Sequence, residues 1–303
     1  MKILVTGSRG QLAQALQTSL ASEGTVLALG HNAMNLAEPE QVRQQIGLLR
    51  PDLIVNAAAY TAVDRAQEEA ELAFAVNATG PRVLAEEAAR LGIPLIHYST
   101  DYVFDGRKRQ PYSEDDVPRP LGVYGASKLA GEQAIAAVGG EYLILRTSWV
   151  YSLHGQNFLL TMQRLLQEKE SLSVVSDEIG APTWAGTIAR ATAQLIRARR
   201  DGQGHFNGLY NLTARGETSW YGFARSIAEH LRQQDCLRAN VEPIASKDYP
   251  TAAERPLNSR LDCTRLHRDW HVQLPHWEAA LQECLMQSQA TMRNTPCSLN
   301  RRA

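Results

Sequence analysis

The feature that most constrains this chain is an alternation of short apolar runs with helix-forming segments through its first half. The apolar runs, bounded by Gly, Pro or Asp, have the length and composition of strands buried on both faces. They lie at residues 2–6, 25–30, 52–56, 94–99 and 142–147. Between them, stretches rich in Ala, Leu, Gln and Glu show helical spacing at 11–22, 38–49, 67–91 and 124–137. This pattern predicts an α/β fold of the Rossmann type, a doubly wound parallel sheet with helices on both faces.

After about residue 150 the alternation weakens, which predicts a second and smaller α/β region. Short strands are expected at 172–177, 209–213 and 240–244, and helices at 183–200, 219–234 and 276–290. We therefore expect residues 1–150 to form the doubly wound domain. Residues 151–286 would mainly form the C-terminal substrate-binding region, with some segments returning to the first domain. Residues 287–303 are polar and lack periodicity, so a disordered tail is expected there.

Charge and segment length argue against several classes of protein. The 31 basic and 32 acidic side chains give a formal charge of -1, so no overall field attracts nucleic acid or an acidic membrane. The apolar run in the first ten residues is too short for a signal peptide, and no stretch approaches the length of a membrane span. The four cysteines have no metal-ligand spacing. We expect a cytoplasmic protein without nucleic-acid or membrane partners.

A glycine-containing turn directly follows the first expected strand. In "TGSRGQLA", Gly7, Gly10 and Ala13 have the spacing G-x-x-G-x-x-A. At a strand-turn-helix junction, glycines let the backbone approach a pyrophosphate, which then lies at the helix N-terminus. A tight turn that only joins strand to helix could use the same glycines. The position at residue 7 of an alternating fold favours a dinucleotide, so residues 1–150 are the expected NAD(P)-binding domain.

The end of the second expected strand bears on which dinucleotide is bound. Sites selective for NAD carry Asp or Glu there to bond the ribose hydroxyls, whereas this chain has Gly30, His31 and Asn32. Arg9, inside the glycine turn, could pair with a ribose 2′-phosphate or be an ordinary surface arginine. The absence of a carboxylate favours NADPH, with NADH also usable.

Tyr124 and Lys128 are four residues apart in an expected helix and so share one face. A phenol has a pKa of about 10, which a nearby ammonium lowers. This pair is typical of a proton donor tuned by its neighbour, although an amphipathic helix surface would give the same spacing. Thr100, after the fourth expected strand, supplies a matching hydroxyl and favours the catalytic interpretation.

These motifs resemble those of the extended short-chain dehydrogenase/reductase superfamily. A narrower resemblance, to the dTDP-4-dehydrorhamnose reductase family, rests on "VNAAAYTAVD", "HYSTDYVFDG", "VYGASKLAGE", "LRTSWVY", "GAPT" and "RPLNSRLD", and runs from residue 2 to about 285. It implies NADPH-dependent reduction of the C4 keto group of dTDP-4-dehydro-L-rhamnose. The product would be dTDP-L-rhamnose for surface polysaccharide such as lipopolysaccharide O-antigen.

The resemblance also implies roles for individual residues. Tyr124 would donate the proton, Lys128 would lower the pKa of Tyr124 and bind ribose, and Thr100 would bond the C4 oxygen. The cofactor-binding positions would be Gly7, Arg9, Gly10, Gln11, Leu12, Asn35, Leu36, Ala59, Tyr60, Thr61 and Tyr98, with Tyr124 and Lys128. The substrate-binding positions would be Thr100, Asp101 and Trp149, with Arg255 and Arg260 as candidate clamps for the diphosphate.

Several of these residues have plainer interpretations that the sequence leaves open. Tyr98 and Trp149 could be core aromatics, Asp101 could cap a turn, and the two arginines could form surface ion pairs. Asn77 could organise a proton relay or only bond the backbone.

The resemblance has one departure, which concerns metal and assembly. Some relatives dimerise around Mg²⁺ held by glutamates, but Ala15 and Gly186 stand where carboxylates would be expected. Because Mg²⁺ needs oxygen ligands, we expect no metal and a monomer or weak homodimer.

Three other functions occur on the same fold. A sugar-nucleotide 4,6-dehydratase would carry Glu after the Asp, where this chain has Tyr102. A sugar-nucleotide 4-epimerase and a non-catalytic NADP-binding regulatory subunit share the fold, so fold alone does not decide. Retention of Thr100, Tyr124 and Lys128 favours the reductase.

Overall fold

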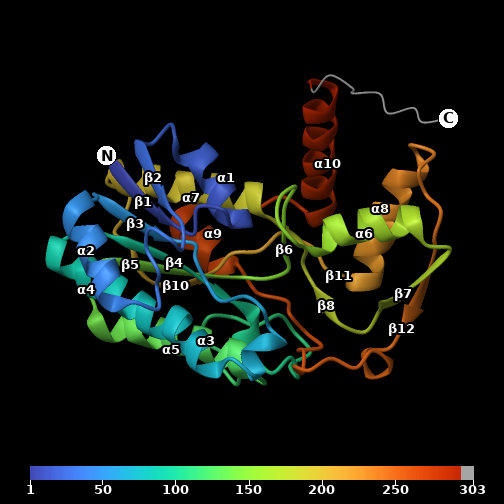
Figure 1. Ribbon diagram of the computed structural model, residues 1–303, viewed down its shortest axis with the longest axis horizontal. Helices are drawn as coiled ribbons and strands as arrows, with labels where there is room; N and C mark the ends of the chain where they lie inside the picture. The colour runs from blue at the N-terminus through green and yellow to red at the C-terminus, as the bar shows by residue number, and fades with distance from the viewer. Residues whose placement is uncertain (295–303) are drawn as a thin grey trace.

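A six-stranded sheet forms the centre of the N-terminal lobe in the computed structural model, which describes residues 1–294 (Figure 1). The strand order is β10-β5-β4-β3-β1-β2, and every adjacent pair is parallel. The strands are β1 (Lys2–Thr6), β2 (Thr25–Leu29), β3 (Leu53–Asn56), β4 (Leu95–Thr100), β5 (Tyr142–Thr147) and β10 (Asn207–Asn211). In space, β1 lies between β2 and β3. The chain therefore continues to one side of β1 with β2 and to the other side with β3, and the strand order reverses there. Ligands of such sheets bind at the carboxyl ends of the strands beside this reversal.

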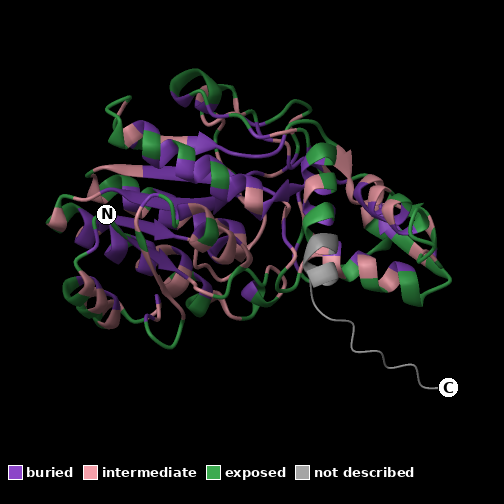
Figure 2. Ribbon diagram, turned by 90° about the horizontal axis from the view of Figure 1, so that it is seen from above, coloured by how far each residue is buried: buried purple, intermediate pink, exposed green. Residues whose placement is uncertain are grey.

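Helices cover both faces of the sheet, as the sequence predicts. One face packs against α1 (Gln11–Leu20), α7 (Ala185–Arg200) and α9 (Thr264–Trp270), and the other against α2 (Pro39–Leu49), α4 (Gly80–Leu91) and α5 (Val123–Val138). Successive strand residues alternate between the faces, so Ile3 and Val5 join the α1 and α7 side while Leu4 joins the other. Figure 2 shows the strands buried between the helical layers. The predicted Rossmann-type doubly wound sheet is confirmed.

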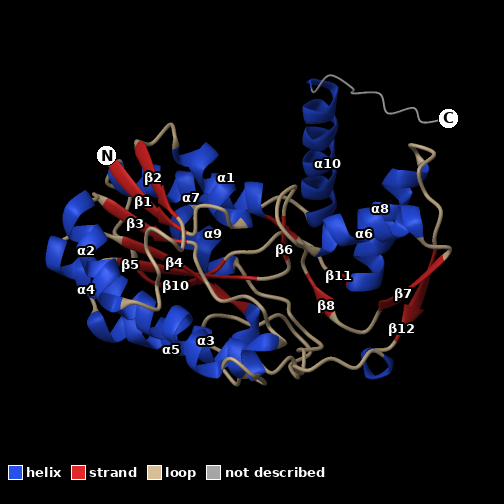
Figure 3. Ribbon diagram, viewed as in Figure 1, coloured by secondary structure: helices blue, strands red, loops and turns tan. Residues whose placement is uncertain are grey.

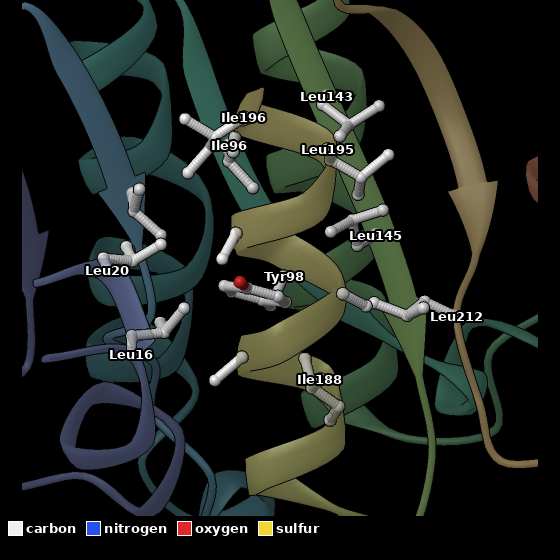
Figure 4. Packing of buried hydrophobic residues seen from close by; sticks show 14 of the residues in the cluster. Leu16, Leu20, Ile96, Tyr98, Leu143, Leu145, Ile188, Leu195, Ile196 and Leu212 are labelled. Carbon is white, nitrogen blue, oxygen red and sulfur yellow. The ribbon is translucent and has the colours of Figure 1, made fainter. Parts of the chain in front are cut away.

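Tyr98 of β4 lies inside the core between the sheet and its helices. Figure 4 shows its ring among Leu16 and Leu20 of α1 and Ile188 of α7. Its hydroxyl oxygen is 2.7 Å from Oγ1 of Thr192, also on α7. The ring of Tyr98 is therefore a core aromatic, which is one of the two interpretations that the sequence left open.

A second lobe is built from the chain after β5 (Figures 1 and 3). It contains β7 (Ser171–Val175) paired with β12 (Asn240–Ile244), and β8 (Ile179–Gly180) paired with β11 (Thr218–Ser219). Its helices are α6 (Phe158–Glu168), α8 (Trp220–Arg232) and α10 (Trp277–Asn294), and β6 (Val150–Tyr151) pairs with β9 (Thr183–Trp184) beside them. Aromatic and aliphatic side chains of α6, α8 and α10 form its own core. The strand β10 and the helices α7 and α9 return from this part of the chain to the first lobe.

The segment expected to be helical at 67–91 is helical from residue 70 to residue 91, with a π-helical turn inside it. It forms a 3₁₀ turn η1 (Arg65–Gln67), α3 (Ala70–Phe74), the π-helical turn η2 (Ala75–Thr79) and then α4. Gly80, at the start of α4, allows a close approach to the loop after β2, because a Cβ there would lie 2.7 Å from the backbone oxygen of Leu36. A π-helical turn often marks a functional position within a helix.

The C-terminal helix extends further than the sequence suggested. We expected a disordered tail from residue 287, but α10 continues to Asn294. Its earlier residues Trp277, Leu281 and Leu285 are buried, and no Gly or Pro interrupts the helix before Pro296. The remaining part of the expected tail, 295–303, lies outside the described residues.

A close approach between α5 and η2 gives a test of the packing. A Cβ on Gly131 of α5 would lie 2.1 Å from the backbone oxygen of Asn77, so Gly131→Ala should lower the free energy of unfolding by about 1–3 kcal/mol. At Gly47, in α2, a Cβ would have no neighbouring atom within 4 Å, and Gly47→Ala should raise the free energy of unfolding by up to about 1 kcal/mol. Urea unfolding of both variants measures this, and equal effects would contradict the packing.

Candidate active site

The glycine turn after β1 has the geometry of a phosphate cradle. Gly7 has a φ of 79°, and a Cβ there would lie 3.1 Å from Cα of Ala58 on the neighbouring strand's loop. The N–H of Gly10 donates to the oxygen of Gly7 at 2.8 Å, and α1 begins at the next residue without a side-chain cap. The first amides of α1 are thus free to bind an anion. The cradle fits a pyrophosphate.

Several predicted cofactor-binding residues surround this turn. Arg9 and Gly10 are exposed, Gln11 is half-buried with an unpartnered Oε1, and Leu12 faces the core. Gly30, at the end of β2, meets Ser8: a Cβ there would lie 2.8 Å from the Ser8 hydroxyl oxygen. A side chain at residue 30 would therefore require the Ser8 hydroxyl to move.

The loops after β2 and β3 carry the other predicted cofactor positions. Asn35 is half-buried, and its Oδ1 accepts the N–H of Ala37 at 3.0 Å, while Leu36 is buried in the core. Ala59 and Tyr60 are half-buried and Thr61 is exposed.

Asn77 ties the loop after β3 to helix α5. Its Oδ1 accepts the N–H of Tyr60 at 2.8 Å, and its Nδ2 donates to the oxygen of Tyr60 and to Oγ of Ser127, both at 3.0 Å. Ser127 in turn donates to the backbone oxygen of Tyr124 at 2.8 Å. Asn77 therefore bonds backbone and also fixes the start of α5, where the predicted catalytic residues lie. The turn η2 carries it.

Thr100 and Tyr124 meet at the carboxyl end of β4. Oγ1 of Thr100 is 3.1 Å from Oδ1 of Asp101 and accepts the N–H of Tyr102 at 3.2 Å. Burial raises the pKa of Tyr124 to about 12, and the hydrogen bond with Thr100 opposes that rise. The ring of Tyr124 lies edge to face against Tyr102, with centroids 5.5 Å apart. Tyr124 is thus a protonated phenol held beside a second hydroxyl.

Lys128 is buried one turn further along α5. Its Nζ is 2.6 Å from the backbone oxygen of Tyr98 and 3.3 Å from Nε2 of His97. Burial lowers the pKa of Lys128 to about 8, and Glu132 acts in the opposite direction. The sequence predicted that Lys128 lowers the pKa of Tyr124. In the structure, the groups that act on Tyr124 are Thr100 and Asp101, because Lys128 is directed toward the strand.

Asp101 is a buried carboxylate beside the phenol. Burial raises its pKa to about 6, against hydrogen bonds with Ser259 and Thr100. Its Oδ2 has no hydrogen-bond partner. An unpaired buried oxygen of this kind is available to a ligand hydroxyl.

Trp149 lies in an aromatic stack at the junction of the two lobes. Its backbone has a φ of 48°, and its ring stacks on Trp220 with centroids 3.6 Å apart. Gly180 leaves room for the ring, since a Cβ there would lie 2.5 Å from it. Nε1 of Trp220 donates to Oε2 of the buried Glu178 at 3.0 Å.

The two predicted arginine clamps occupy different places. Arg255 pairs with Asp64 at 2.8 Å; burial lowers the pKa of Arg255, but the hydrogen bond with Asp64 and the nearby charge of Glu178 raise it above its ordinary value. Arg260 is bonded to Oδ1 of Asn258 and to Glu217, both at 2.8 Å. It lines a cavity of about 490 Å³ with Thr213 and Cys263, and none of the predicted catalytic residues lines that cavity. The structure brings Arg255, but not Arg260, toward the site.

Sequence reasoning missed His97, Glu178, Trp220 and Ser259. His97 stands directly before Tyr98 in a buried strand, where a titratable residue is a signal in itself. Glu178 lies two residues before Gly180 of "GAPT". Trp220 and Ser259 carry no local signal, because their positions depend on how the two lobes pack.

The described residues were compared with the requirements of a metal site and of a membrane span. Within 1–294, no group of three or more His, Cys, Asp or Glu side chains is placed to hold a metal ion. No helix in that range combines the length and apolar character required to cross a bilayer.

Comparisons with known proteins show the family to which the chain belongs. The family model described as RmlD substrate binding domain matches residues 1–290. The chain is 43% identical over 292 residues to a dTDP-4-dehydrorhamnose reductase of Burkholderia thailandensis, covering 94% of this chain and 98% of the relative. It is 41% identical over 291 residues to the enzyme of that name from Escherichia coli K12, covering 94% and 97%.

The chain also resembles solved structures of this family. A crystal structure of dTDP-4-dehydrorhamnose reductase from Bacillus anthracis in complex with NADP has a TM-score of 0.88 and 35% identity, covering 94% of this chain and 99% of the other. A UDP-glucose 4-epimerase of Thermus thermophilus in complex with NAD has a TM-score of 0.78 at 20% identity, which shows a shared fold alone.

The buried carboxyl of Asp101 predicts a pH-dependent stability. The pKa of Asp101 in the folded state, about 6, lies above the ordinary value of 3.8. Ionisation of Asp101 therefore lowers the free energy of unfolding as the pH rises. This loss is absent below pH 4 and complete above pH 6. Asp101→Asn should therefore gain on the wild type by on the order of 2–3 kcal/mol between pH 4 and 7. Denaturant unfolding at several pH values measures this. Exposed Asp248→Asn is the control and should show no such trend; a parallel trend in both would contradict the assignment.

Proposed function

We propose the function of this chain from one premise: it belongs to the dTDP-4-dehydrorhamnose reductase family. The proposed reaction is the NADPH-dependent reduction of the C4 keto group of dTDP-4-dehydro-L-rhamnose to dTDP-L-rhamnose. The observation that carries it is the half-buried phenol of Tyr124 next to the buried hydroxyl of Thr100, at the same carboxyl edge of the sheet as the glycine turn. NADPH, when bound, would supply the hydride to C4.

Thr100 and Tyr124 would act on the oxygen at C4. As that oxygen gains negative charge, the two hydroxyls would hydrogen-bond it, and Tyr124 would then donate its proton. The raised pKa of Tyr124 supports this role, because the phenol is protonated near neutrality and its proton is available. The product is an alcohol at C4.

The cofactor would lie along the edge from the glycine turn to α5. The free amides at the start of α1 would hold the pyrophosphate, and Arg9 would pair with a 2′-phosphate. Residue 30 is a glycine pressed against Ser8, which supports NADPH over NADH since no carboxylate stands there. Lys128 would hold the nicotinamide ribose, as the family resemblance implies.

The sugar nucleotide would occupy the junction of the two lobes. The unpaired oxygen of Asp101 would accept a hydroxyl of the sugar, and the Trp149 ring would contact the ligand. Of the two arginines, Arg255 would approach the diphosphate, while Arg260 is bonded to Asn258 and Glu217.

A monomer or weak homodimer remains the proposal for assembly. Ala15 and Gly186 offer no carboxylate to a bridging Mg²⁺. At Gly186 a Cβ would lie 2.6 Å from the ring of Trp184, so a larger side chain would not fit without a shift.

The proton-donor role of Tyr124 is tested by Tyr124→Phe. This variant should lose about 10²- to 10⁴-fold in kcat, because the ring stays but the acid is gone, with the Kd for NADPH changed little. Tyr151→Phe is the matched control. It removes a buried hydroxyl of the second lobe that has no hydrogen-bond partner. Steady-state NADPH oxidation and fluorescence titration measure both. A Tyr124→Phe rate within a few-fold of the wild type would rule out the role.

A further inference from the structure

Four buried polar side chains form a continuous hydrogen-bonded chain that ends at Lys128. Oγ1 of Thr6 on β1 is 2.6 Å from Oδ1 of Asn56 on β3. Nδ2 of Asn56 is 2.8 Å from Nδ1 of His97 on β4, whose Nε2 is 3.3 Å from Nζ of Lys128. Each of these side chains belongs to a residue no more than 2% exposed. At the far end, Thr6 accepts the N–H of Ala58 at 2.9 Å.

The chain has two consistent directions, because an asparagine amide can turn over and a neutral histidine has two tautomers. In one direction, Thr6 donates to Asn56, Asn56 donates to Nδ1 of His97, and Nε2–H of His97 donates to a neutral Lys128. In the other, an ammonium at Lys128 donates to Nε2, Nδ1–H donates to Asn56, and Asn56 donates to Thr6. Neither direction places two donors or two acceptors face to face. Because Ala58 donates to Thr6 in both, only the first direction gives the hydroxyl hydrogen of Thr6 an acceptor, and this favours the first direction when Lys128 is neutral.

The other groups around Lys128 do not adapt in this way. The backbone oxygen of Tyr98 accepts only, and Glu132, the titratable group further along α5, is paired with Arg146 of β5 at 2.6 Å. His97 itself stays neutral, since burial, and then the charge of Lys128, lowers its pKa well below its usual range. Within residues 1–294, His97 is the side chain hydrogen-bonded to Nζ.

The chain cannot carry protons to solvent. It ends at the N–H of Ala58, a backbone amide that donates and does not accept. The hydrogen bonds of the chain can therefore only reverse their donor and acceptor roles when the charge of Lys128 changes.

We propose that His97 is a positioning residue for Lys128. By changing its tautomer, it remains a hydrogen-bond partner of Nζ both when Lys128 is protonated and when it is neutral, and so keeps the lysine in one place. The importance of this for turnover rests on the proposed function, whereas the exchange of tautomers does not involve the substrate.

The tautomer exchange is measured on the wild-type protein by ¹⁵N NMR of labelled histidine. The His97 signals are assigned by their loss in His97→Gln. We expect the ring to stay neutral from about pH 6 to 10 while Nδ1 and Nε2 exchange their protonated character, with a midpoint near the pKa of Lys128, about 8. A single tautomer over the whole range, or an imidazolium, would overturn the proposal.

The effect on turnover is measured as the pH dependence of kcat/KM. His97→Leu removes an acceptor that favours the ammonium, so the alkaline limb should move to lower pH by on the order of one unit. His97→Gln, whose amide can either accept or donate, should restore the limb to within about 0.3 unit. Thr192→Val is the control: it removes a buried hydroxyl bonded to Tyr98 on the opposite face of the same strand and should leave the limb in place.

An unmoved limb in His97→Leu, or an equal shift in Thr192→Val, would overturn the proposal. If His97→Leu does not fold, the NMR titration and His97→Gln decide. If the wild type turns over no dTDP-4-dehydro-L-rhamnose, the proposed function fails, and the NMR titration still decides the role of His97.

Discussion

The burial of Lys128 is the constraint on which the rest of the site depends. An amine removed from water is costly unless hydrogen bonds replace the lost hydration. Here the replacements are the oxygen of Tyr98 and the ring of His97, both on β4. Helix α5 must therefore lie close to the strand. On another side of α5, Gly131 allows η2 to lie in backbone contact with the helix.

The same approach sets the character of Tyr124. Burial raises the pKa of the half-buried Tyr124 phenol and lowers that of the fully buried Lys128 amine. The sequence suggested that a nearby ammonium lowers the pKa of Tyr124. In the structure the Lys128 amine is directed toward the strand, and a phenol that keeps its proton near neutrality suits the donor role.

Most of the first lobe could be predicted because its signals are local. The five apolar runs became β1 to β5, and the glycine turn, Thr100 and Tyr124 all lie at the carboxyl edge that parallel pairing requires. What could not be predicted depends on contacts distant in sequence. Gly80 lies against Leu36, Trp220 stacks on Trp149, and Glu178 bonds Trp220, and each of these contacts joins residues that are far apart in the sequence. The motif that contains Arg255 and Arg260 gave no indication that the two side chains have different neighbours, Glu178 for Arg255 and Glu217 for Arg260.

The activity proposed for this chain is the reduction of a keto sugar joined to a nucleotide. The most direct test follows NADPH oxidation at 340 nm with dTDP-4-dehydro-L-rhamnose, formed in the cuvette from dTDP-glucose by a 4,6-dehydratase and a 3,5-epimerase. We expect oxidation that requires both upstream enzymes and ends with dTDP-L-rhamnose. NADPH that binds but is never consumed would contradict the account and favour a regulatory, non-catalytic role.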